Sequence, residues 1–125
     1  CQVESLNTYY GKRSYLMSRV YITNHRMRKR DGEIVPAIDL RPAERFGTLT
    51  PVFDHAMNPS DDADIRDARA RIKSFDDEHD YILPSGSPIA TLTVGMLLRD
   101  QGVKIIQVLE WDRFDLKYHL RTVSL

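Results

Sequence analysis

The sequence has little that would hold a chain together covalently or anchor it in a membrane. Its 125 residues contain one cysteine, at position 1, so no intramolecular disulfide can form and no cysteine-based zinc site can be completed. No apolar run approaches the ~20 residues that a membrane-spanning helix needs. We therefore expect a cytoplasmic protein that has no membrane contact.

The chain also lacks an excess of charge of either sign. It carries 18 basic and 18 acidic side chains, and 42% of its residues are hydrophobic, which is the composition of an ordinary globular domain. A net charge of zero argues against a dedicated nucleic-acid-binding protein. At this length, one domain is the expected number.

The motifs of several enzyme and cofactor classes are missing as well. The sequence contains no P-loop, no GxGxxG fingerprint and no GxSxG nucleophile elbow. Its four histidines show none of the HxH, HExxH or Cys/His spacings that are typical of zinc sites. We therefore predict no metal site and no cofactor, name no catalytic residue, and regard an enzyme as the less favoured class of function.

What the sequence does contain is an uneven distribution of charge. Residues 1–50 carry nine Lys/Arg and five Asp/Glu, whereas residues 51–80 carry four and nine. The acidic residues gather at 61–64 and 76–80. The basic residues are densest in the loop predicted at 25–30, as Arg26, Arg28, Lys29 and Arg30. Such runs are usually solvated surface; the alternative is that the 25–30 and 76–80 stretches are recognition surfaces.

The first 16 residues differ from the rest of the chain. They show neither a helical nor a strand period, and Met17 stands directly before a strand-like segment. Codons for Lys12–Ser14 can contain AGGAG, the core of a bacterial ribosome-binding site, which would make Met17 the native start. We therefore expect residues 1–16 to be a non-native or flexible N-terminal segment and residues 17–125 to be a single α/β domain. The alternative is that Cys1 is the lipid-bearing first residue of a mature lipoprotein.

Hydrophobic periodicity predicts two main helices. The first spans 60–75, with Ser60 as its N-cap and one apolar stripe formed by Ile65, Ala68, Ile72 and Phe75. The second follows Ser87 and Pro88 and ends before Gly102. Apolar residues surround most of the circumference of this second helix, so we expect it to be buried on more than one side.

The remaining periodic segments are predicted strands. β-branched and aromatic residues favour strands at 19–23, 81–83 and 103–111. Alternating apolar and polar residues from 114 to 120 predict an antiparallel strand that pairs back on 103–111. The fold class is therefore α/β (or α+β): a small mixed sheet with a right-handed βαβ unit, two main helices and a C-terminal β-hairpin, in which Trp111 packs on Tyr118.

One candidate site follows from this topology. In open α/β sheets, ligands bind beyond the carboxyl ends of the parallel strands. The residues expected there are Ser85, Gly86 and Ser87 at a helix N-terminus, Asn24 and His25 after the first strand, and Asp39. The amides of this loop suit a phosphate or carboxylate. The alternative is that the loop is only a tight entry to the helix.

Three segments carry a resemblance to known sequences. They are Ala43–Gly47, Asp80–Gly86 and Val108–Arg113 with Tyr118, and they resemble small uncharacterised α/β proteins of phages and mobile genetic elements. The resemblance implies an accessory protein of bacterial or viral origin. It implies no activity and therefore no catalytic residue.

Two classes of function remain. The first is an accessory binding module that contacts a protein partner or forms a homodimer through an exposed sheet edge. The second is a small nucleotide- or phosphate-ligand-binding enzyme, a hydrolase or transferase, with its site at the 84–87 loop. Nucleic-acid binding by the basic stretch is disfavoured, because aromatic residues are not interleaved with its cations.

Overall fold

The computed structural model describes residues 18–125. The N-terminal segment predicted at 1–16, the predicted start at Met17 and the alternative lipid anchor at Cys1 lie outside the described residues. The elements are, in chain order, β1 (Arg19–Asn24), β2 (Met27–Arg30), β3 (Glu33–Pro36), the 3-10 helix η2 (Arg41–Phe46), β4 (Thr48–Phe53), α2 (Asp62–Arg71), β5 (Tyr81–Leu83), α3 (Pro88–Asp100), β6 (Ile105–Asp112) and β7 (Lys117–Ser124).

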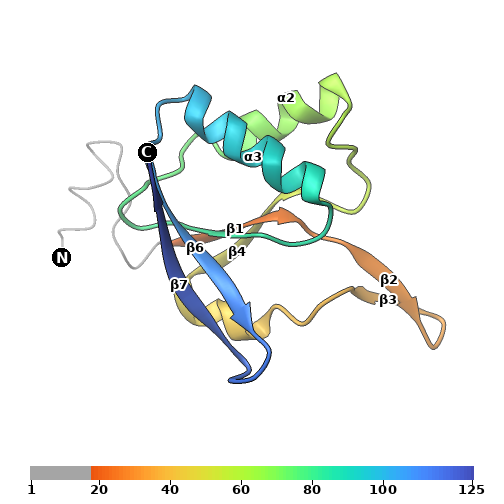
Figure 1. Ribbon diagram of the computed structural model, residues 1–125. Helices are drawn as coiled ribbons and strands as arrows, with labels where there is room; N and C mark the ends of the chain where they lie inside the picture. The colour runs from red at the N-terminus through yellow and green to blue at the C-terminus, as the bar shows by residue number, and fades with distance from the viewer. Residues whose placement is uncertain (1–17) are drawn as a thin grey trace, which may run out of the picture.

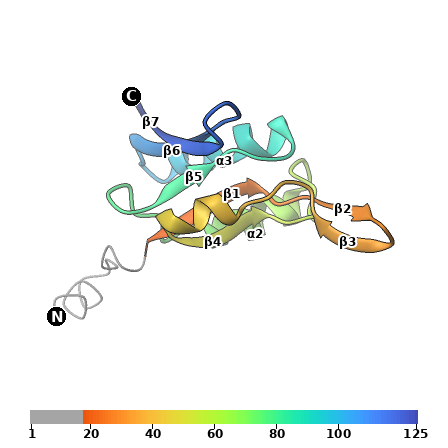
Figure 2. The same ribbon diagram turned by 90° about the horizontal axis from the view of Figure 1, so that it is seen from below.

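The main sheet is mixed and has five strands in the order β4-β1-β5-β6-β7 (Figures 1 and 2). The first four are parallel to one another, and β7 pairs antiparallel with β6. The predicted parallel pair with its connecting helix is therefore β5-α3-β6, and the predicted C-terminal hairpin is β6-β7. The predicted α/β or α+β fold class is confirmed.

Both faces of this sheet are covered. Helices α2 and α3 lie on one face and η2 lies on the other (Figures 1 and 2). Side chains of β1 pack in the cores on both faces of the sheet, because successive side chains of a strand point to opposite faces. Tyr21 packs in the core beneath the helices. Val20 and Ile22 pack in the core that includes Ala43 of η2. The position of β1 between β4 and β5, with both faces covered, explains why its residues 20–24 are all buried.

Strands β2 and β3 form a separate two-stranded sheet that projects from the body of the molecule (Figure 1). Asp31 and Gly32 connect them with φ angles of +51° and +84°, which suit a two-residue hairpin turn. The stretch predicted as a basic loop at 25–30 is largely strand β2, because Met27–Arg30 pairs with Glu33–Pro36.

Helix α2 is shorter than predicted. Asp61 rather than Ser60 is its N-cap, because the Asp61 carboxylate accepts a hydrogen bond from the Asp64 amide at 3.1 Å. The helix ends at Arg71, yet Ile72 and Phe75 beyond its end remain in the core. The apolar stripe was therefore predicted correctly, although the helix limits were not.

Helix α3 has the predicted limits but not the predicted burial. Ser87 caps it through hydrogen bonds from the amides of Ile89 and Ala90. One face, which includes Val94 and Leu98, packs in the core, whereas Leu92 and Met96 are 65% and 74% exposed. Burial on more than one side was wrong, since the helix forms an outer layer and only its inner face meets the sheet. Among the described residues, no helix is both long and apolar enough to cross a membrane.

The last strand begins three residues later than its alternating pattern suggests. Phe114 and Leu116 lie in the turn before β7 and are 85% and 68% exposed. Trp111 and Tyr118 are cross-strand neighbours whose ring centroids are 4.9 Å apart, as predicted. Within residues 18–125, β7 is an edge of the sheet; a homodimer through this edge stays a prediction.

Candidate recognition surface

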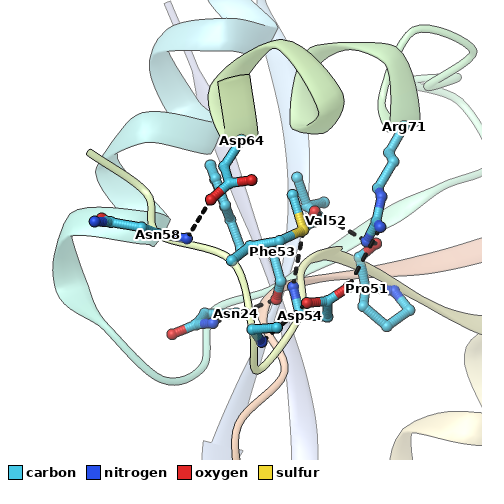
Figure 3. A network of polar contacts seen from close by, with 10 residues as sticks. Asn24, Pro51, Val52, Phe53, Asp54, Asn58, Asp64 and Arg71 are labelled. Carbon is cyan, nitrogen blue, oxygen red and sulfur yellow. Dashed lines mark hydrogen bonds and ion pairs between the residues drawn. The ribbon is translucent and has the colours of Figure 1, made fainter. Parts of the chain in front are cut away.

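Asn24 joins three parallel strands at their carboxyl ends. Its side chain is 1% exposed. The Asn24 Oδ1 atom accepts a hydrogen bond from the Ser87 amide at 2.9 Å. The Asn24 Nδ2 atom donates one to the carbonyl of Phe53 at 3.3 Å (Figure 3). The His25 amide donates to the same carbonyl at 2.7 Å. Asn24 at the end of β1 is thereby tied to the end of β4 and to the loop after β5.

Thr23 makes the second connection to this loop, and sequence reasoning missed it. Its hydroxyl oxygen accepts a hydrogen bond from the Ser85 amide at 2.9 Å and lies 2.9 Å from the hydroxyl of Thr91 on α3. Thr23 is 1% exposed. The sequence feature that could have identified Thr23 is its position next to Asn24 at the end of a buried strand.

Gly86 is required where the loop passes over Asn24. It has a φ of +74°, and a Cβ atom there would lie 2.5 Å from Asn24 Oδ1 and 2.7 Å from the Asn24 carbonyl oxygen. A side chain is therefore excluded by both conformation and space. The absence of a side chain at Gly86 therefore allows the loop backbone to lie close to Asn24.

Two backbone amides of the 84–87 loop are used within the chain. The amides of Ser85 and Ser87 donate to Thr23 and Asn24, and the first free amides of α3 donate to the Ser87 hydroxyl. An anion bound through these amides would have to displace their acceptors. The structure brings together four of the predicted site residues, Asn24, Ser85, Gly86 and Ser87; their binding of a phosphate stays a prediction.

His25 and Asp39 lie elsewhere, in a hollow of about 510 Å³ beside the hairpin. Its wall includes Arg30 and Pro36 of the hairpin together with Ile38. Asp39 is bound by Arg41 at 2.9 Å and 2.8 Å. The Arg41 hydrogen bonds lower the pKa of Asp39 to about 2, so its carboxylate stays charged at mildly acidic and neutral pH.

A second hollow of about 400 Å³ lies beyond the carboxyl ends of β5 and β6. It is lined by Ile38, Asp39, Pro42, Leu83, Pro84, Trp111 and Tyr118. This is where an open parallel sheet usually binds its ligands. Burial raises the pKa of the Tyr118 hydroxyl, and the negative charge of Asp39 adds to this shift. Sequence reasoning assigned Trp111 and Tyr118 to packing and did not place them at a hollow.

The two hollows form one continuous surface, because Ile38 and Asp39 line both of them. We call the hairpin β2-β3 and these two hollows the recognition surface. At its hairpin end, Arg28, Lys29 and Arg30 are exposed. At its other end, Trp111 is 41% exposed.

The acidic 76–80 stretch is partly internal. Asp80 is fully buried, and its carboxylate accepts hydrogen bonds from the Arg19 amide at 2.9 Å and the Asp76 amide at 2.8 Å. Asp76 in turn lies 2.9 Å from the His79 ring. Asp77 and Glu78 are the members of this stretch that remain exposed.

Comparison with protein families identifies the relatives of this chain. The model of the phage Pam3 gp32-like protein family matches residues 18–125. The chain belongs to this family. No curated protein matches the chain, and no solved structure does.

Membership in the phage Pam3 gp32-like family confirms the predicted resemblance to small phage proteins. Two of the segments that carried this resemblance, Asp80–Gly86 and Val108–Arg113, contribute Leu83, Pro84 and Trp111 to the second hollow. The family places the chain among phage-associated proteins, and any activity has to be argued from its surface.

Proposed function

We propose that this phage-family protein is an accessory binding module that recognises an acidic polypeptide through the recognition surface. The observation that carries the proposal is the continuity of this surface. Its hollows share Ile38 and Asp39, so they connect the basic hairpin with the aromatic pair Trp111 and Tyr118.

The hairpin supports a role in recognition because it has little core of its own. A two-stranded hairpin is only marginally stable in water, and most of the side chains of β2 and β3 are exposed. Ile34 near its tip is 63% exposed. An ordered, projecting arm of this kind gains its stabilising contacts when a partner packs against it.

The chemistry of the surface favours a protein as partner. Trp, Tyr and Arg are the residue types that dominate binding energy at protein interfaces, and all three line these hollows. The row Arg28, Lys29 and Arg30 attracts carboxylates. The second hollow accepts one apolar side chain of the partner, while acidic residues beside that side chain meet the hairpin.

Charge reversal on the hairpin tests the proposal. We expect the triple variant R28E/K29E/R30E to retain at least about tenfold less protein from a nuclease-treated lysate of phage-infected bacteria, because like charges across an interface cost several kcal/mol. Quantitative mass spectrometry of the captured proteins measures the loss. Trp111→Ala, which empties the other end of the surface, should weaken the same interaction.

The matched control is R66E/K73E/K104E, which changes the charge by the same amount at exposed positions away from the hairpin. It should retain the partner. Equal losses in the two triple variants would show that net charge alone governs capture, and unchanged capture by the hairpin variant would refute the proposed surface.

A further inference from the structure

Three metal-ligating side chains meet at the turn between β6 and β7. Asp112 ends β6, Asp115 lies in the turn, and His119 is on β7. The Nε2 atom of His119 is 3.1 Å from Asp112 Oδ2 and 3.4 Å from Asp115 Oδ2. All three ligating atoms lie within 4.8 Å of one another.

The His119 Nε2 atom is buried beside two carboxylates. It is shielded from solvent, and among the described residues it is the one buried side-chain nitrogen or oxygen without a hydrogen-bond partner. Oxygen atoms of the Asp112 and Asp115 carboxylates are its nearest charged neighbours in this cluster. A metal cation placed between the three atoms would take Nε2 and both carboxylate oxygens as ligands.

Backbone amides of the turn fix the orientation of the Asp112 carboxylate. Its Oδ1 atom accepts hydrogen bonds from the amides of Phe114 at 2.8 Å and Asp115 at 3.0 Å, which leaves Oδ2 directed at His119. These backbone hydrogen bonds lower the pKa of Asp112, and the charge of a protonated His119 lowers it further. The carboxylate is therefore held in place as an anion.

We propose that Asp112, Asp115 and His119 bind a divalent transition-metal ion, with zinc as the preferred ion. Zinc binds imidazole nitrogen and carboxylate oxygen at about 2.0–2.2 Å, so neighbouring ligand atoms lie roughly 3.0–3.5 Å apart. The two distances from His119 Nε2 fall in this range. One imidazole with two carboxylates is a donor set that suits zinc better than calcium or magnesium, which prefer oxygen alone.

The site would fix the turn beside the second hollow. Its fourth coordination position remains for water or for a ligand atom from a bound molecule. Trp111 immediately precedes Asp112 and is the only tryptophan of the chain, so its fluorescence reports directly on an ion bound there.

The test is a titration of the metal-free full chain with Co²⁺, followed by displacement with Zn²⁺. It is made in a C1S background, because Cys1 is the only thiol and itself binds these ions. We expect saturable quenching of Trp111 by one Co²⁺ per chain with a dissociation constant of about 1–100 μM, and recovery of the fluorescence when Zn²⁺ displaces cobalt. His119→Ala and Asp115→Asn should each remove the saturable quenching.

The control variant is His79→Ala, which removes a histidine that also contacts an aspartate, Asp76. It should bind Co²⁺ like the parent chain, and circular dichroism should show that all variants are folded. The proposal is overturned if the parent chain shows no saturable quenching up to ~1 mM Co²⁺, or if His119→Ala binds as well as the parent. In that case, the contacts of His119 with the two carboxylates only stabilise the turn.

Discussion

Replacing Gly86 with alanine is expected to lower the free energy of unfolding by ~3–4 kcal/mol, which adds the cost of a positive φ to that of overpacking a buried site. The new methyl group would meet the side-chain oxygen and the carbonyl oxygen of Asn24. Relief of this clash must separate the Ser87 amide from Asn24 Oδ1 and so loosen the start of α3. Urea unfolding followed by circular dichroism measures the change.

Gly102 provides the matched control for this substitution. It also has a positive φ, of +92°, but a Cβ atom there would meet no atom within 4 Å. Gly102→Ala should therefore cost only the conformational part, about 1–2 kcal/mol. If the two variants lose the same stability, the contact between Gly86 and Asn24 is not what limits this position.

Removal of the Asp80 carboxylate is the second large effect that we expect. Asp80→Ala leaves the amides of Arg19 and Asp76 without their acceptor at a fully buried position. Each buried donor left unsatisfied costs about 1–3 kcal/mol, so a loss of about 2–5 kcal/mol should appear in thermal or urea unfolding. The loss arises at the start of β1, one of the two inner strands of the parallel part of the sheet.

Two comparisons identify the cause of that loss. Asp80→Asn keeps a side-chain oxygen and should lose less stability than the alanine variant. Asp77→Ala removes an exposed carboxylate from the same stretch and should change stability by no more than about 0.5 kcal/mol. A destabilisation by Asp77→Ala as large as that by Asp80→Ala would contradict this account.

The parts of the fold that were predictable are those with local signals. Ser87 and Pro88 mark the start of α3, and β-branched residues mark β1 and β6. The short connections through α3 then require parallel strands. The exposure of Leu92 and Met96 was not predictable, because periodicity reports which residues are apolar and not whether another layer covers them.

The contacts at the 84–87 loop were beyond sequence reasoning for a different reason. The sequence suggested that the amides of this loop were free to bind a ligand. Their acceptors in the structure, Thr23 and Asn24, are about 60 residues earlier in the chain. That pairing depends on the register of β1 beside β5, which short segments do not specify. Only the juxtaposition of Asn24 with Gly86 followed from the expected topology.

The cluster of Asp112, Asp115 and His119 was missed because the predicted limits of one strand were wrong. A strand running from Phe114 would separate Asp115 from His119 by about 13 Å, at roughly 3.3 Å per residue. Leu116 instead has a φ of +56° in a turn, which returns the chain and leaves the two side chains 3.4 Å apart. The alternating pattern of 114–120 gave no indication of this turn.

The most direct measurement of the central proposal is site-specific photo-crosslinking in phage-infected cells. A photoreactive residue at position 28, on the exposed hairpin, is compared with one at position 66, on the exposed side of α2. The proposal predicts a discrete polypeptide adduct from position 28, with an acidic crosslinked segment, and none of the same mass from position 66. Adducts from position 28 that disappear with nuclease, or the same polypeptide adduct from both positions, would contradict a polypeptide-binding surface on the hairpin.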